Sequence, residues 1–353
     1  MEKRLKEIIA EITLPDRKVQ EQASRRQDEL TKPRGSLGVL ESLSIQIAGI
    51  QGRACPRIKD KVIFTLAGDH GITAEGVSAY PAEVTPQMVF NFLGGGAGIN
   101  VLARQIGARV VVADLGVNFD FTPPQAPVDL KIAKGTKNML MEPAMTREEA
   151  VRSVMAGIDL VNREASQGLD IMGTGDMGIG NTTPSSAITA VLTASPVVEV
   201  TGRGAGLDYK GLASKAAAIE MALAVNQPEP SDTLDVLAKV GGFEIGGIAG
   251  LIIGGARRKV PVVIDGFISG AGALIAHALA PQVKDYLIAA HQSVEIGHQR
   301  ILKHLGLRPL LNLDMRLGEG TGAALGIFLA QCAVAALNEI ATFAEAGVSG
   351  QEE

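Results

Sequence analysis

The chain has 353 residues, of which 46% are hydrophobic and 20% charged, so it can bury a sizeable core and does not have the composition of a disordered protein. A net charge of −5 and an aromatic content of 3% argue against a nucleic-acid-binding protein, which needs basic patches and stacking rings. The two cysteines, Cys55 and Cys332, are far apart in sequence and predict neither a disulfide framework nor a thiolate zinc site.

The first 51 residues are predicted to be helical. Residues 1–18 have the pattern of an amphipathic helix, without the apolar segment or cleavage site of a signal peptide. Lys32-Pro33-Arg34-Gly35 separates a polar helical segment from one with apolar residues at helical spacing. Glycine and charged residues interrupt the apolar stretches of the chain. We therefore expect no membrane-spanning run of about 18 residues, no membrane partner and a cytoplasmic protein.

From residue 61 onward, short apolar runs alternate with alanine-rich helical segments. The runs are found at residues 61–71, 108–117, 169–178, 195–206 and 260–269. Each run ends in glycine and polar residues. This alternation predicts an α/β fold with a Rossmann-like parallel sheet covered by helices on both faces. Such sheets bind ligands at the carboxyl ends of their strands, so the polar residues after each run are candidate site residues.

The third run contains a possible dinucleotide-binding loop. Gly173, Gly175 and Gly178 spell G-x-G-x-x-G, and Glu199 supplies the acidic residue expected about 20 positions later. Asp176 lies inside this loop and would repel a pyrophosphate. The motif therefore leaves an NAD-binding site open without establishing one.

The helix that follows this loop is expected to start with amide and hydroxyl side chains. These residues are Asn181, Thr182 and Thr183. With the free N–H groups of a helix start, they would suit a single phosphate or a ribose. The same residue types are also ordinary N-caps, so both interpretations remain open.

A second glycine run, "TGRGAGLDYKGLASK", comes one predicted unit later. Gly202, Gly204 and Gly206 permit close approach of the backbone, and Lys215 lies within the next predicted helix. Backbone amides with a lysine can form a phosphate nest, although no P-loop motif can be aligned. The alternative for Lys215 is a solvated helix face.

Glu319 lies between Gly318 and Gly320, directly before the last predicted helix. A carboxylate between two glycines can be held in a cavity, where burial raises its pKa toward the range of a general base. The alternative is an acidic residue that interacts with the dipole at the start of its own helix.

The last segment, "GTGAALGIFLAQCAVAALNEIATFAEAG", predicts one long alanine-rich helix. Helices at both ends of the chain could pack together. We therefore expect a small helical domain made of residues 1–55 and 325–353, beside a large α/β domain of residues 56–324.

The histidine and serine patterns do not indicate other common chemistries. His70 follows Asp69 as an isolated pair, and His291 and His298 lack the spacing of a zinc-protease motif. No G-x-S-x-G nucleophile motif occurs. We therefore expect neither a metal nor a serine nucleophile.

Three blocks of the sequence resemble one family. "GTGDMGIGNTTPSSAI", "KVGGFEIGGIAG…PVVIDGFIS" and "MRLGEGTGAALG" are similar to the nicotinate-nucleotide–dimethylbenzimidazole phosphoribosyltransferases of cobalamin biosynthesis, and the resemblance runs in order from about residue 5 to residue 345. It implies transfer of phosphoribose from nicotinate mononucleotide to 5,6-dimethylbenzimidazole. The products would be α-ribazole 5′-phosphate and nicotinate, with inversion at C1′. It also implies a homodimer that needs no cofactor.

The resemblance also implies roles for individual residues. Glu319 matches the general base, and Asp176 matches a second acidic position beside the ribose, where the family more often has glutamate. Tyr80 stands where some members have a small serine, which could change the acceptor toward adenine, another benzimidazole or a phenol. The remaining matched positions line the substrate site: Gln87, Met88, Gly175, Met177, Gly178, Asn181, Thr182, Gly202, Gly204, Lys215, Asp265, Ser293, Arg316, Leu317 and Gly318.

Two other functions remain as alternatives. A nicotinamide-dependent oxidoreductase would use the glycine loop at 173–178, and a non-catalytic module would bind a nucleotide without turning it over.

Overall fold

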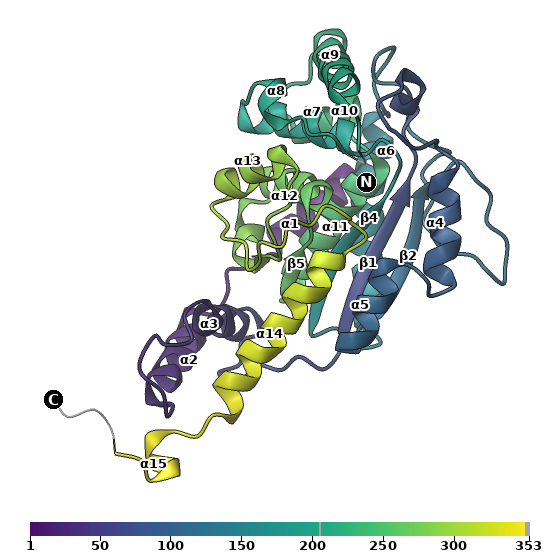
Figure 1. Cartoon of the computed structure of the whole chain (residues 1–353). Helices are drawn as coiled ribbons and strands as arrows, with labels where there is room; N and C mark the ends of the chain where they lie inside the picture. Colours follow the sequence, from purple (N-terminus) through teal and green to yellow (C-terminus); the bar gives the residue numbers. More distant parts are fainter. Residues whose placement is uncertain (205, 350–353) are drawn as a thin grey trace.

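The computed structural model describes residues 1–204 and 206–349 (Figure 1). Ala205, in the second glycine run, and residues 350–353, in the predicted helical domain, lie outside the described residues. A six-stranded parallel sheet forms the centre, in the order β3-β2-β1-β4-β5-β6. Its strands are β1 (Lys61–Gly68), β2 (Arg109–Gly116), β3 (Val128–Asp129), β4 (Ile171–Met177), β5 (Val262–Ile264) and β6 (Leu287–Ala289). The predicted parallel α/β fold is confirmed.

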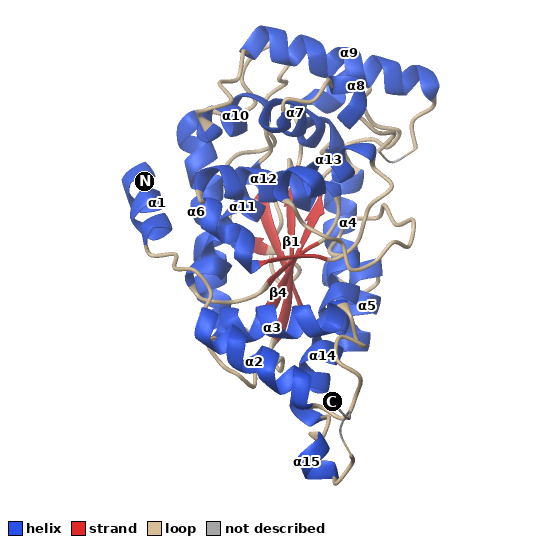
Figure 2. Cartoon of the chain, turned by 90° about the vertical axis from the view of Figure 1, so that its left-hand side faces the viewer, coloured by secondary structure: helices blue, strands red, loops and turns tan. Residues whose placement is uncertain are grey.

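Helices cover both faces of this sheet (Figure 2). The helices of the α/β body are α4 (Val84–Leu93), α5 (Gly98–Ile106), α6 (Arg147–Ala165), α7 (Thr182–Thr193), α9 (Tyr209–Asn226), α10 (Thr233–Val240), α11 (Phe243–Arg257), α12 (Phe267–Leu279) and α13 (Ile296–Leu305), with 3-10 turns at Gly71–Glu75 and Pro281–Tyr286. Side chains of β1 alternate between the faces: Val62 and Phe64 join the core under α6 and α11, and Ile63 joins the core under α5 and α14 (Thr321–Glu339).

Helix α11 packs unusually close to α6. An added Cβ on Gly157 of α6 would lie 2.0 Å from the carbonyl oxygen of Gly247 in α11. The glycines therefore let the two backbones touch, and almost every residue of α11 is buried. This packing fixes the start of α11, which reaches the carboxyl edge of the sheet near Gly68.

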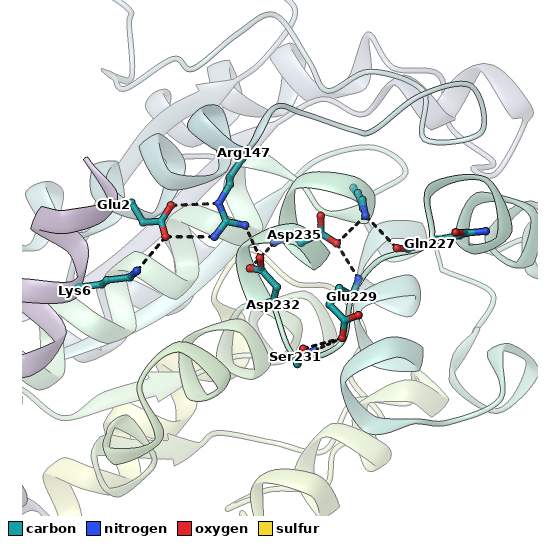
Figure 3. Close-up of polar contacts among 9 residues, drawn as sticks. Glu2, Lys6, Arg147, Gln227, Glu229, Ser231, Asp232 and Asp235 are labelled. Carbon is teal, nitrogen blue, oxygen red and sulfur yellow. Dashed lines mark hydrogen bonds and ion pairs between the residues drawn. The ribbon is translucent and has the colours of Figure 1, made fainter.

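The terminal helices α2 (Arg17–Glu29), α3 (Val39–Gln51) and α14 pack together through Ala23, Ala48 and Leu337. Helix α1 (Glu2–Ala10) lies elsewhere, because its Leu5 and Ile8 belong to the main core. Arg147, at the start of α6, donates hydrogen bonds to both Glu2 in α1 and Asp232 before α10 (Figure 3). The division into two domains therefore stays a prediction, with α1 attached to the large α/β body.

Two predicted elements are wrong in detail. Residues 195–206 do not form a strand: α8 (Val197–Val200) is a short helix that buries Val197 and Val200, three positions apart, and exposes Glu199 to pair with Arg300. The C-terminal segment is not one helix, because α14 ends at Glu339 and α15 (Phe343–Ala346) starts after an extended Ile340. There the chain bonds to Thr31, and Thr342 caps the new helix.

Helix α14 corrects the expectation that the chain has no apolar run of membrane-spanning length. Thr321–Glu339 is long and apolar enough to cross a membrane, but 56% of the window is buried inside the protein. Its Ala323 and Ile327 pack against the sheet. The same pattern is common in the core helix of a folded domain.

Candidate active site

Buried polar side chains gather where the strands end. The chain leaves β1 through Asp69 and His70, β4 through Asp176, β5 through Asp265, and β6 through His291, Ser293 and Glu295; all are at most 7% exposed. The loop 316–320 before α14 closes over the same edge, since Gly320 N–H donates to Asp265 Oδ2 at 3.0 Å. The predicted location of the site, at the carboxyl ends of parallel strands, follows from this topology.

The three glycines of the fingerprint are in contact with protein rather than with open space. An added Cβ would lie 2.9 Å from Ala323 Cβ at Gly173, 2.4 Å from the Glu319 carbonyl oxygen at Gly175, and 2.3 Å from the Gly68 carbonyl oxygen at Gly178. A dinucleotide loop needs such glycines for the cofactor's pyrophosphate. Here the glycines leave room for α14, for the loop before it and for the end of β1. This argues against an NAD site.

Glu319 is held in a strained loop. Gly318, Glu319 and Gly320 have φ values of 82°, 63° and 95°, so three successive residues adopt the left-handed conformation that a glutamate disfavours. The Glu319 carbonyl oxygen accepts a hydrogen bond from Thr65 Oγ1 at 2.9 Å. The flanking glycines therefore let the chain present one carboxylate at the edge of the sheet.

The Glu319 carboxylate, only 5% exposed, points to a helix other than its own. Its Oε2 accepts the N–H of Ile99, at the start of α5, at 3.0 Å. Burial raises the pKa of Glu319 and the negative charge of Asp265 adds to it, while the N–H groups of Ile99 and Gly98 oppose the rise. This contact does not favour the alternative of an interaction with the dipole of its own helix, and the environment suits a base that can both gain and release a proton.

Asp265, and not Glu319, interacts with the start of α14. Its carboxylate accepts the N–H groups of Gly320 (3.0 Å), Gly322 (2.7 Å) and Ala323 (3.1 Å), and lies 3.6 Å from His291 Nε2. It therefore caps α14 and fixes the residue next to Glu319. These contacts join Asp265 to the loop of Glu319.

We expect Asp265→Asn to lower the free energy of unfolding by about 2–4 kcal/mol. The NH2 group of the asparagine would replace one accepting oxygen, so a buried backbone N–H would lose its acceptor. Urea denaturation measures this loss. Asp170→Asn is the matched control: Asp170 accepts the N–H groups of Lys59 and Asp60 at the opposite edge of the sheet, so its loss should lower stability alone. Turnover should fall only in Asp265→Asn, and equal activity in both variants would contradict this role.

Asp176 lies beside the Glu319 loop. It is 6% exposed and accepts a hydrogen bond from Asn181 Nδ2 at 2.9 Å, so Asn181 turns toward Asp176 instead of capping α7. Burial, followed by the negative charge of Asp265, raises the pKa of Asp176 to about 8. An added Cβ on Gly318 would come within 3.4 Å of Asp176 Oδ2. The site therefore holds two adjacent carboxyl groups that a cation would stabilise in the charged form.

Lys215 is fully buried, so a solvated helix face is excluded. Its Nζ donates to Thr182 Oγ1 at 2.6 Å, and Gly204 lies beside both groups. Burial lowers the pKa of Lys215 to about 8, although the Glu295 carboxylate opposes this shift. A buried ammonium with a hydroxyl and a glycine loop is suited to bind a phosphate.

Glu295 is a site residue that sequence reasoning did not identify. An added Cβ on Gly202 would lie 2.0 Å from Glu295 Oε2, so the glycine leaves room for this acid near Lys215. Burial raises the pKa of Glu295, against the positive charge of Lys215. The polar segment "AAHQSVEIGH" was the available signal, but its pairing with the glycine run depends on the fold.

The other predicted residues differ in burial. Ser293 N–H donates to His298 Nδ1 at 3.0 Å, and its Oγ accepts the N–H of Glu295. Met88 and Met177 are half-buried beside the core that includes α4. The exposed positions are Tyr80, Gln87, Arg316 and Leu317. Of these, Leu317 lies beside Glu319: an added Cβ on Gly98 would be 3.0 Å from Leu317 Cδ2 and 3.2 Å from Glu319 Oε2. The assignment of the exposed side chains to the base pocket stays a prediction.

Comparison with known proteins extends over nearly the whole chain. A phosphoribosyltransferase family model matches residues 12–348. Nicotinate-nucleotide–dimethylbenzimidazole phosphoribosyltransferase of Desulforudis audaxviator is 59% identical over 345 residues, 98% of each chain. The protein of the same name from Geobacter sulfurreducens is 55% identical over 98% of both chains. The crystal structure of CobT from Thermus thermophilus has a TM-score of 0.90 and 46% identity, covering 94% of this chain and 99% of that one.

Proposed function

This chain belongs to the nicotinate-nucleotide–dimethylbenzimidazole phosphoribosyltransferase family, and we propose that Glu319, Asp176 and Lys215 carry its reaction. It is a phosphoribosyltransferase that moves the phosphoribosyl group of nicotinate mononucleotide to 5,6-dimethylbenzimidazole. The products are α-ribazole 5′-phosphate and nicotinate. One observation carries this assignment of roles. Gly175 lies against the Glu319 carbonyl oxygen and Gly318 lies against the Asp176 carboxylate, so Glu319 and Asp176 are held together at one edge of the sheet.

The nucleotide lies along the site with its phosphate at one end and its ribose at the other. The phosphate interacts with Lys215, Thr182 and the glycine run, where a buried ammonium lies beside a hydroxyl and the backbone of Gly204. The ribose then lies toward Asp176, and C1′ faces the Glu319 loop. This order is supported by Thr182, which follows directly after Asn181, the partner of Asp176.

The transfer is a single displacement at C1′. One nitrogen of the azole forms a bond to C1′ as the bond from C1′ to the nicotinate nitrogen breaks, and its electron pair leaves with nicotinate. Glu319 takes the proton from the other azole nitrogen, which keeps the product neutral at the ring. Positive charge that develops on the ribose is stabilised by the Asp176 carboxylate, since the positive pyridinium ring of the bound nucleotide lowers the raised pKa of Asp176. Attack opposite the leaving group inverts C1′.

Chromatography of a reaction with nicotinate mononucleotide and dimethylbenzimidazole tests the function. We expect both nicotinate and α-ribazole 5′-phosphate to form in equal amounts. Nicotinate without the second product would indicate hydrolysis, and binding without turnover would favour the non-catalytic alternative. Competition with adenine, another benzimidazole and a phenol then tests acceptor choice, for which Tyr80, 54% exposed, is the variable position.

The assembly and location complete the proposal. The chain forms a homodimer in the cytoplasm and has no nucleic-acid or membrane partner. Large apolar side chains that are more than a third exposed support a dimer surface; they include Tyr80, Phe90, Leu317 and Phe328. Light scattering after gel filtration distinguishes a dimer from a monomer.

A further inference from the structure

A buried polar cluster lies under the loop that carries Asn181, and the reaction described above does not use it. His70 and Glu244 are 3% and 0% exposed, and His70 Nε2 lies 2.8 Å from Glu244 Oε1. His70 follows β1, whereas Glu244 lies in the first turn of α11. Two buried ionisable groups from distant segments are expensive to bury unless their pairing serves the fold or the site.

The backbone around this pair leaves room for it. An added Cβ on Gly242 would lie 2.5 Å from His70 Cε1, and one on Gly68 would lie 2.9 Å from Glu244 Oε2. An added Cβ on Gly178 would lie 3.2 Å from His70 Nε2. The pair therefore fills the space directly beneath the start of loop 178–181.

The same loop has a second support. Ile179 N–H donates to Thr85 Oγ1 at 3.1 Å. Burial raises the pKa of Asp69, and the nearby Thr85 hydroxyl opposes this rise, so Thr85 also lies beside the end of β1. Thr85 is fully buried in the first turn of α4. Its hydroxyl thus holds the loop to α4 by a hydrogen bond and lies beside the Asp69 carboxylate at the end of β1. Asp69 Oδ2 in turn accepts the N–H of Asn118 at 2.8 Å.

We propose that Thr85, Asp69, His70 and Glu244 form a clamp that positions loop 178–181 and, through Asn181, the carboxylate of Asp176. None of the four touches the substrate in this proposal, so they are positioning residues. The proposal rests on the function above, because Asp176 is given its role there. Asn181 is the link: its backbone N–H donates to the Gly178 carbonyl oxygen, and its side chain donates to Asp176.

Charge supports the same arrangement. The charged groups that act on His70 are Glu244 and Asp69. Burial lowers the pKa of His70, but the charge and hydrogen bond of Glu244, and then the charge of Asp69, raise it above its usual value. The imidazolium places a positive charge beneath a group of carboxylates, and the charge of Glu244 in turn helps to raise the pKa of Asp176.

The test is Thr85→Val against Thr85→Ser in the full-length protein, with nicotinate release as the assay. Valine keeps the volume and removes the hydroxyl, so we expect kcat to fall about tenfold to a hundredfold from misplacement of the loop, with the KM for nicotinate mononucleotide changed less than about threefold. Serine keeps the hydroxyl and should stay within about threefold of wild type. Thr189→Val is the matched control, since the buried Thr189 hydroxyl bonds only to Ser185 within α7.

His70→Gln and Glu244→Gln test the charged half of the clamp. Loss of the cation should move the acid limb of the kcat profile to higher pH, and loss of the anion should move it to lower pH. Amide exchange at Ile179 provides a readout independent of turnover, and it should speed up in Thr85→Val. An inactive wild type would disprove the proposed function alone. Unchanged kcat and unchanged exchange in folded Thr85→Val would overturn the clamp.

Discussion

Glu319→Gln should fold, bind nicotinate mononucleotide and lose about 100-fold to 10,000-fold in kcat, the range that general-base catalysis contributes. Glutamine keeps the volume of the side chain and an oxygen that can accept the Ile99 N–H, so the strained loop has the same support. It cannot take a proton from the azole nitrogen. The loss should therefore lie in kcat, with little change in the KM for the nucleotide.

The pH profile separates this explanation from a structural one. Burial raises the pKa of Glu319, so the acid limb of wild-type activity should lie above the usual range of a glutamate, and the contribution of Glu319 to that limb should be missing in Glu319→Gln. Glu164→Gln is the control: Glu164, 3% exposed, pairs with Arg109 at the opposite edge of the sheet. Its loss can lower stability but should leave turnover intact. Nicotinate release near the wild-type rate in Glu319→Gln would remove Glu319 as the base.

The sequence predicted the sheet and its functional edge because both follow from local patterns. Apolar runs that end in glycine and polar residues mark strands β1, β2, β4 and β5, and parallel strands bring their carboxyl ends to one edge. The run at 195–206 does not form a strand. Only two of its valines are buried in the core, and they are three positions apart, as in a helix.

The G-x-G-x-x-G motif shows that a sequence can match a motif in position without having the function that the motif usually indicates. Gly173, Gly175 and Gly178 do lie along β4 and its turn, as the motif requires. What each glycine admits, a cofactor or another part of the chain, depends on tertiary contacts that a single sequence does not contain. Asp176 was the local clue, because a carboxylate conflicts with a pyrophosphate but suits a developing cation.

The pairs formed across the chain were beyond prediction for the same reason. Glu244 meets His70 across 174 positions, and Asp265 meets Gly320 across 55. An interaction with the helix that follows it was one of two alternatives for Glu319, and its carboxylate accepts instead an N–H of α5, 220 residues earlier. The sequence could indicate that such a polar residue was functional or buried. Which residue it pairs with depends on the fold.

Lys215→Met should raise the KM for nicotinate mononucleotide by about 100-fold or more and at the same time raise the melting temperature of the empty protein. The first effect follows from loss of a buried charged partner for phosphate, which costs about 2–5 kcal/mol when such a contact is removed. The second follows because burial lowers the pKa of Lys215 to about 8, so at pH 7 the folded protein carries an ammonium that would be better solvated in the unfolded chain. Isothermal titration and thermal unfolding measure the two effects on the same samples.

The sign of the pH dependence makes the argument specific to Lys215. Between about pH 8 and the ordinary lysine pKa, the unfolded chain binds this proton and the folded chain does not, so this group makes wild-type stability rise with pH in that range. Phosphate affinity should change in the opposite direction, falling above about pH 8 as the empty site loses its cation. Lys210→Met is the control, since Lys210 is exposed near the start of the same helix. If Lys215→Met binds the nucleotide normally, the phosphate lies elsewhere and the order of binding from Lys215 to Asp176 is wrong.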